Sequence, residues 1–150
     1  MPSTPSEGRP PDVGLLCFIA GRAMETRVME AVAAAGFDDL TLAQARVGAR
    51  LQPGGTRVSV LAEASGVTKQ TASFLVDQLE AAGYVRRVAD PTDARARLVV
   101  LAERGEAVRA VARRTEDAVH AEWADHLGAR DYRRLRQLLT RLREVTDPYA

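Results

Sequence analysis

Apolar residues recur at helical spacing in six stretches of the 150-residue chain, and two short stretches between them fit β-strands. The clearest helix follows Thr68, whose hydroxyl suits an N-cap because it can accept a backbone N–H of the first turn. Four apolar residues of this helix stand at positions i, i+3, i+4 and i+7, so one stripe packs inward. They are Ala72, Leu75, Val76 and Leu79. A shorter helix precedes it and ends at Gly66, so the pattern predicts a helix-turn-helix.

A β-hairpin is predicted directly after this motif. Gly83 ends the second helix, and residues 84–89 fit a strand in which Val85 and Val88 are apolar and Arg86 and Arg87 are solvated. Residues 97–101 fit its partner strand. Residues 90–93 read Asp-Pro-Thr-Asp, which suits the turn between them and places Arg95 at or near the tip. We therefore expect a mainly α fold with a small β-hairpin wing, which is a winged helix-turn-helix.

Amphipathic helices flank the predicted winged helix on both sides. Residues 13–36 and 104–147 carry apolar stripes that so small a domain cannot bury alone, and we expect them to form a dimerisation region. The winged helix-turn-helix then occupies residues 37–103. Residues 1–12 are rich in Pro, Ser and Gly and are expected to form a flexible tail.

Two segments carry a family resemblance. The sequence LAEASGVTKQTASFLVDQLEAAGYVRR followed by DPTDARARLVVLAERG resembles the MarR family (multiple antibiotic resistance regulators) of bacterial dimeric winged-helix transcription factors. The resemblance extends over roughly residues 13–145, and its most specific parts are the LExxGYVxR step and the DxRA wing. It implies a homodimeric transcriptional regulator that binds pseudo-palindromic double-stranded DNA, and it favours a repressor over an activator. It also implies a pocket for a small phenolic or aromatic ligand between the dimer helices and the DNA-binding region.

Candidate DNA-binding residues lie on the second helix of the motif and on the wing. In such motifs the start of the recognition helix enters the major groove, where Gln can bond adenine bidentately and hydroxyls can bond phosphate or base. The resemblance places the wing arginine at Arg95, which suits a narrow A/T-rich minor groove. Asp93 is placed to brace it. The full set is Thr68, Lys69, Gln70, Thr71, Ser73, Asp93, Arg95 and Arg97.

The predicted recognition helix is less basic than is usual in the family, because Phe74 and Gln78 stand where arginine is common. Phe74 can contact a thymine methyl or pack against a neighbouring segment, and packing is favoured. The sparse positive charge, together with the outward Asp77, keeps an alternative open in which the chain is a winged-helix protein-interaction module without DNA binding.

Composition narrows the remaining possibilities. The net charge is +1, so any nucleic-acid footprint is local, and residues 84–114 supply one with eight arginines against four acids. No apolar run approaches the ~20 residues that span a bilayer, so we expect no membrane segment and a cytoplasmic protein. The chain has no GxSxG, phosphate-binding loop or HExxH motif. We therefore expect neither enzymatic activity nor a cofactor.

Cys17 is the single cysteine, so no internal disulfide can form. Its segment, Leu-Leu-Cys-Phe, resembles the first helix of the organic-hydroperoxide-sensing branch of the family, in which tyrosines stabilise the thiolate. Here Gly21 occupies the tyrosine position one turn onward. A small core residue is therefore favoured for Cys17, with a redox switch as the alternative. No metal site is expected, since His120 and His126 point to different sides of one helix.

Overall fold

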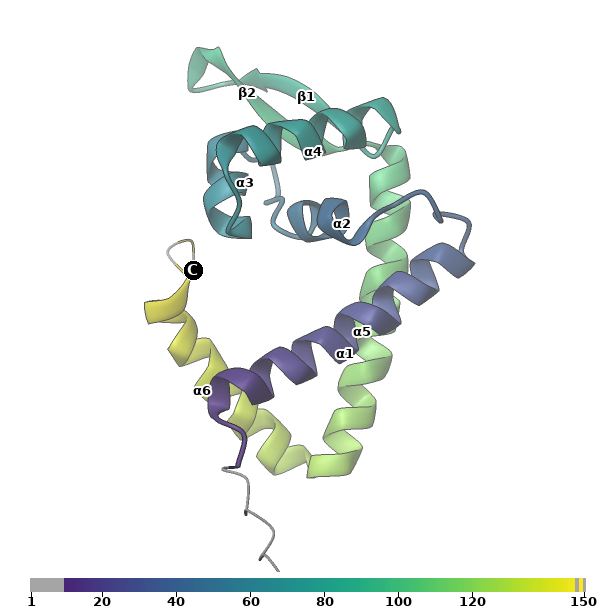
Figure 1. Ribbon diagram of the computed structural model, residues 1–150, viewed down its shortest axis with the longest axis vertical. Coiled ribbons are helices and arrows are strands. Elements are labelled where there is room, and N and C mark those ends of the chain that lie inside the picture. The colour runs from purple at the N-terminus through teal and green to yellow at the C-terminus, as the bar shows by residue number, and fades with distance from the viewer. Residues whose placement is uncertain (1–9, 148, 150) are drawn as a thin grey trace, which may run out of the picture.

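The computed structural model describes residues 10–147 and 149, and in them it has six helices and one antiparallel hairpin (Figure 1). The elements are α1 (Val13–Ala34), α2 (Leu42–Gly48), α3 (Val58–Ser65), α4 (Lys69–Ala81), β1 (Val85–Asp90), β2 (Asp93–Leu101), α5 (Glu103–Leu127) and α6 (Ala129–Thr146). This confirms the mainly α winged-helix fold. Most of the predicted tail, residues 1–9, lies outside the described residues.

The helix-turn-helix forms as its caps predict. Gly66 ends α3 with φ of 67°, a left-handed conformation that glycine adopts without a Cβ penalty. The next backbone N–H, that of Val67, then donates back to the carbonyl of Ala62 at 3.0 Å. The hydroxyl of Thr68 accepts the backbone N–H of Thr71 at 3.1 Å and caps α4. The inward stripe of α4 is fully buried, so this helix is held on the protein by one face and leaves the other in solvent.

The wing is longer than the sequence predicted. β2 begins at Asp93 rather than at residue 97, because the register shifts at Asp90 and pairs Asp90 directly with Asp93. Only two residues are left for the turn. Thr56 adds a short bridge on the other edge of β2, exchanging backbone hydrogen bonds with Val99 at 3.0 and 2.9 Å. Arg95 therefore lies on the first residues of β2, next to the tip.

The core joins the end of α1 to the winged helix. Five of the most deeply buried side chains come from five different elements: Val32 (α1), Val47 (α2), Leu61 (α3), Val76 (α4) and Val99 (β2). The C-terminal end of α1 thus packs with α2, α3, α4 and the wing in one unit, which we call the head. Because apolar burial is the main stabilising term, this shared core holds the elements of the head together.

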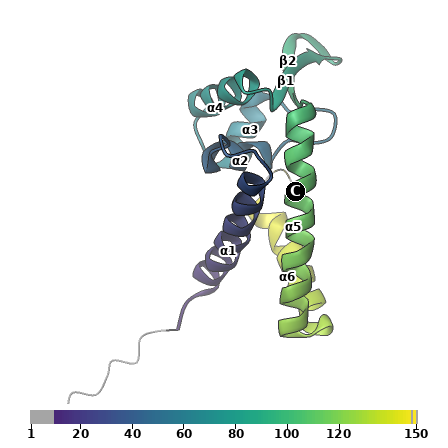
Figure 2. The ribbon, with the colours of Figure 1, turned by 90° about the vertical axis from the view of Figure 1, so that its right-hand side faces the viewer.

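The other helices extend away from the head. α5 runs from the wing to the opposite end of the molecule, α1 crosses it, and α6 turns back toward the head (Figure 1). Val119 of α5 is buried where α1 and α5 pack together, and Arg27 pairs with Glu122 through two hydrogen bonds of 2.9 Å. Figure 2 shows the N-terminal half of α1 diverging from α5.

Apolar side chains remain exposed on the N-terminal half of α1 and along α6. On α1 they are Val13, Leu15, Leu16, Phe18 and Ile19, and on α6 they are Leu135, Leu138, Leu139, Leu142 and Val145. None of the residues of α6 is buried, although its apolar and charged residues are sharply segregated. In the part of the chain that the structure describes, no helix is long and apolar enough to span a membrane.

Candidate nucleic-acid interface and effector cavity

The N-terminal half of α4 presents the predicted polar residues to solvent. Thr68, Lys69, Gln70 and Thr71 are exposed, whereas Ser73 is half-buried. The Thr68 hydroxyl is already occupied, since it caps the helix and donates to the Thr71 hydroxyl at 2.9 Å. The Thr71 hydroxyl accepts that bond and keeps its own proton, so Lys69, Gln70 and this hydroxyl donor are the groups of this turn that can reach a ligand.

Phe74 corrects one sequence-based expectation. Packing against a neighbouring segment was favoured, but the side chain is 60% exposed on the outer face of α4. Gln78, one turn further along, is different: its side-chain oxygen accepts the amide of Gln44 from α2 at 3.2 Å. The outer face of α4 thus carries one exposed aromatic ring among polar side chains.

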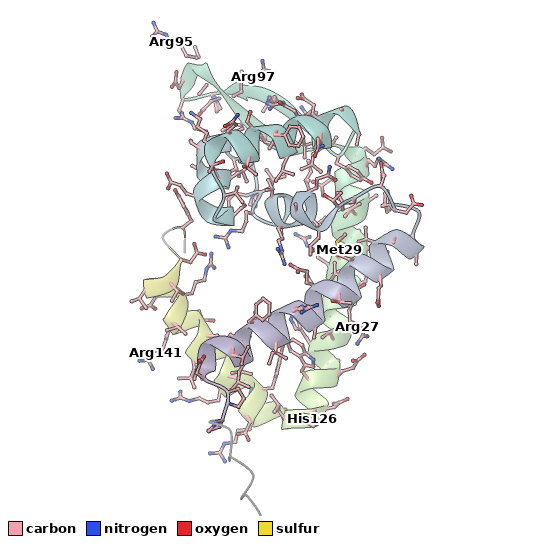
Figure 3. All side chains as sticks on the ribbon, in the orientation of Figure 1. Arg27, Met29, Arg95, Arg97, His126 and Arg141 are labelled. Carbon is pink, nitrogen blue, oxygen red and sulfur yellow. The ribbon has the colours of Figure 1, made fainter. Side chains whose placement is uncertain are left out.

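The two wing arginines lie at the same end of the molecule as α4 (Figure 3). Arg95 is exposed and points away from the body, and Asp93 accepts its backbone N–H at 3.0 Å. The brace that the sequence predicted from Asp93 therefore acts on the backbone of Arg95. Arg97 donates to the carbonyl of Arg87 across the hairpin at 3.1 Å. The wing presents Arg95 with a free guanidinium and Arg97 with a partly engaged one.

A carboxylate that sequence reasoning missed anchors the wing. Asp90 is buried at the turn and accepts the backbone N–H and hydroxyl of Thr92 at 2.8 and 2.7 Å. Its other oxygen accepts two hydrogen bonds from Arg57, at 2.9 and 2.6 Å. These bonds, those of Thr92 foremost, lower the pKa of Asp90 to about 2. The wing tip is thereby tied to the residue that precedes α3.

Arg87 is a second correction, because the strand pattern predicted it as solvated. Its side chain is only 20% exposed and donates to Asp77 at 2.6 Å and to Glu80, both on α4. The physical reason is that β1 follows α4 through a tight turn and lies against its C-terminal half. Asp77, which motivated a protein-binding alternative, is consequently paired with a cation.

A third group of side chains joins the head to α5. The carboxylate of Asp39 accepts two hydrogen bonds of 2.9 Å from Arg104 and one of 2.5 Å from the Tyr84 hydroxyl. The Arg104 guanidinium also lies 4.2 Å from the centre of the Tyr84 ring. Burial, followed by the Asp39 contact, raises the pKa of Tyr84 to about 12. The first turn of α5 is therefore fixed to the head.

A cavity of about 340 Å³ lies between α1, α2 and α5. Its walls are mainly aliphatic, and its polar groups come from α5 and α2: Arg109, Arg113, Glu116 and Gln44. Arg109 donates weakly to the carbonyl of Leu51 at 3.4 Å, while Arg113 makes no hydrogen bond or ion pair with any described residue. A second cavity of about 390 Å³ adjoins it and shares Val28 and Met29. The size and lining suit a small, partly apolar anion.

The remaining candidate residues stand apart from these sites. Cys17 is exposed on the diverging half of α1, so the expectation of a core position is wrong for this chain taken alone. The reason is that this half of α1 has no neighbouring element to cover it. Across residues 10–147 and 149, no three His, Cys, Asp or Glu side chains converge as a metal site would require.

Comparison with known proteins agrees with this geometry. Residues 38–96, which include α2, α3, α4, β1 and the start of β2, match the sequence model of the MarR family. No curated protein matches the sequence. The matched segment contains the helix-turn-helix and Arg95, so the match falls on residues that form most of the candidate interface.

Solved structures share the fold over nearly the whole chain. The MarR family protein Rv2887 of Mycobacterium tuberculosis, in complex with salicylic acid, is 27% identical, with 88% of this chain and 96% of that one covered and a TM-score of 0.63. CouR of Rhodococcus jostii RHA1, bound to p-coumaroyl-CoA, is 25% identical, with coverage of 97% and 99% and a TM-score of 0.72. The transcriptional regulator Tm0710 of Thermotoga maritima is 26% identical, with 89% of each chain covered and a TM-score of 0.58. The chain thus resembles the MarR family over residues 38–96 and shares the fold of solved transcriptional regulators over most of its length.

Proposed function

We propose that the protein is a cytoplasmic homodimeric repressor that binds a pseudo-palindromic DNA site and releases it when a small aromatic acid binds. The observation that carries the proposal is the placement of two exposed groups at one end of the head. Lys69 and Gln70 open α4, and Arg95 projects from the wing beside it (Figure 3). A recognition helix in a major groove with a wing arginine in the next minor groove uses this arrangement.

In this proposal Gln70 bonds a base edge, Lys69 and Thr71 contact phosphate, and Arg95 enters the minor groove. Arg97 supports the wing and approaches the backbone. Thr68 serves as the cap of α4, and Ser73 and Asp93 act by positioning their neighbours. The ties from Asp90 to Arg57 hold the wing at a fixed angle to α3, so that both elements reach the DNA together.

Dimerisation is supported by the exposed apolar faces of α1 and α6. Residues 13–36 and 104–147 are proposed as the dimer region, because a second copy would cover both faces at once. A two-fold dimer presents two recognition helices to successive major grooves, about 34 Å apart. Cys17 would then lie in the interface, where it acts as a small apolar residue, and a redox role stays the narrower alternative.

The cavity between α1, α2 and α5 is proposed as the effector site. Arg113 would pair with the carboxylate of the ligand, and the aliphatic walls, including Val28 and Val108, would hold its ring. The salicylic acid and p-coumaroyl-CoA named for the similar structures support this chemistry. Salicylate at 100 times its Kd should stabilise the fold by about 2.7 kcal/mol, and Arg113→Gln should weaken that effect.

The proposal is tested by fluorescence anisotropy on DNA from the region upstream of the protein's own gene, titrated at several salt concentrations. Binding by phosphate contacts must weaken by roughly 0.9 log units per log of salt for each phosphate neutralised. Arg95→Ala should cost about 1 to 3 kcal/mol, while Arg130→Ala, an exposed arginine at the start of α6, should change nothing. Weak binding that changes neither with salt concentration nor on Arg95→Ala substitution would favour the winged-helix protein-interaction module instead.

A further inference from the structure

Phe74 is the one feature of the recognition surface that a phosphate-binding role does not explain. Its ring is 60% exposed in the middle of α4, and the exposed residues around it are polar. The inward stripe of the helix is complete without it, since Ala72, Leu75 and Val76 are all buried. A single exposed apolar residue is ordinary on a protein surface, so its position on the helix must carry the argument.

Phe74 lies one helical turn beyond Gln70 on the same face of α4. Residues four apart are neighbours on a helix surface and are separated by about 6 Å along the axis. Successive base pairs are separated by about 3.4 Å, so two such side chains meet bases within about two steps of each other. If Gln70 reaches a base edge, Phe74 reaches the edge of a base close by.

The ring carries no hydrogen-bonding group, and among major-groove edges only thymine offers an apolar one, its C5 methyl. The charges nearby also allow the approach. Asp77, which is three residues from Phe74, and Glu80 would repel DNA, but both are paired with Arg87 of the wing. Arg87 offsets one of the two negative charges and hydrogen-bonds both carboxylates, so the contact does not bring an unpaired carboxylate to the phosphates.

We propose that Phe74 determines sequence specificity by contacting the C5 methyl of a thymine within two base pairs of the base that Gln70 bonds. The inference rests on the proposed DNA binding and deepens it, because it assigns the base class that one position of each half-site must hold. Gln70 favours adenine and Phe74 favours thymine, so the half-site is expected to contain two A·T pairs within two steps of each other.

The test begins with duplex sites selected by the full-length protein from a random library. Each thymine of the selected site is then replaced in turn by deoxyuridine, which keeps the base pairing and removes only the methyl group. For the wild type, replacing the contacted thymine in one half-site should weaken binding about fourfold, and replacing it in both half-sites about fifteenfold, which is the expected loss of one buried methyl at each site. For Phe74→Ala the same replacement should leave the affinity for DNA unchanged. Two changes that remove the same direct contact are not additive. Phe74→Leu should retain part of the methyl dependence and serves as the conservative control.

The outcomes separate the inference from the function on which it rests. Tight, salt-dependent binding in which no deoxyuridine replacement matters, or in which Phe74→Ala keeps the full methyl dependence, would overturn the inference and leave DNA binding intact. Selection of no site, with no salt-dependent binding, would overturn both. Because Phe74 lies outside the core, circular dichroism should show an unchanged fold in both variants.

Discussion

The proposed dimer can be tested with two leucines of α6. Leu138 and Leu142 are each 44% exposed and lie on the same face of the helix. Complete burial of a leucine contributes about 1.5 to 3 kcal/mol, so covering the exposed fraction of one side chain contributes about 0.7 to 1.3 kcal/mol. A two-fold interface contains each residue twice. The double variant Leu138→Ala, Leu142→Ala should therefore lose about 3 to 5 kcal/mol of association free energy, which raises the dimer Kd about 100-fold to 5,000-fold.

Analytical ultracentrifugation over a wide concentration range measures this change. The matched control is Gln137→Ala with Glu144→Ala, which alters the opposite, polar face of α6 and should leave the dimer Kd within a few-fold. The variant chain should keep its helical circular dichroism, because none of the residues of α6 is buried within the chain. A monomeric wild type, or a leucine variant as dimeric as the control, would refute the argument that these faces are covered by a second copy.

Three further predictions concern two helical glycines, the buried carboxylate of Asp90 and the proposed effector cavity. Substitution by alanine should change the free energy of unfolding in opposite directions at two helical glycines. Gly48→Ala should stabilise the fold by up to about 1 kcal/mol, because its new Cβ meets nothing within 4 Å. Gly105→Ala should destabilise it by about 3 kcal/mol or more in urea unfolding, because the Cβ would lie 2.1 Å from the carbonyl oxygen of Tyr84. The pKa of Asp90 is lowered to about 2, so its stabilising effect is complete above about pH 4 and is lost as the pH falls to about 2. Asp90→Asn should therefore be less stable than the wild type at pH 7, with a gap that narrows toward pH 2; a gap that is constant with pH would contradict this. With salicylate bound, amide hydrogen exchange should change most in residues 108–116 of α5, and a change confined to α6 would contradict the proposed cavity.

Local sequence signals were enough to predict the helix-turn-helix. Its helices are set by short-range features, namely the periodic apolar stripe, the Thr68 cap and the Gly66 turn, and each of these operates within a few residues. The sequence Thr41-Leu42-Ala43-Gln44 carries a signal of the same short range, a capping box, and both of its hydrogen bonds form. The hairpin was predicted in the right place for the same reason, although its register was not.

The interactions that position the candidate site could not be predicted in this way. Asp90 pairs with an arginine 33 residues earlier, and Asp39 pairs with one 65 residues later. Neither pair leaves a periodic signal, because the partners meet only after the head has folded. Arg87 shows the same limit: alternation along a strand predicts which side a residue faces, but not that α4 supplies two carboxylates there.

The sequence favoured packing for the aromatic ring on α4 and a core position for the thiol on α1, but both side chains are exposed. The two predictions failed for a shared reason. An apolar residue is usually covered by its own chain, so the sequence favours a core position for it. Phe74 and Cys17 instead lie on two of the surfaces that this chain leaves open, the outer face of α4 and the diverging half of α1. Failures of a local rule are expected at such surfaces if they are functional, because under the proposed function DNA or a second copy, rather than the chain itself, covers them.

The joints of α5 indicate how a ligand in the cavity can act on the proposed DNA-binding face. The first turn of α5 is fixed to the head by Arg104 and by the close contact of Gly105 with Tyr84. Further along, Val119 and the Arg27–Glu122 pair fix α5 to α1. The cavity is lined by the α5 residues between these two joints, from Val108 to Glu116, and by the part of α1 that leads into the head. If the cavity is the effector site, a ligand that pushes these helices apart would strain both joints, and a tilt of the head against the α1–α5 crossing would relieve that strain. In a dimer held through α1 and α6, that tilt would change the distance between the two recognition helices. This distance must match the spacing of the two half-sites in a pseudo-palindromic site.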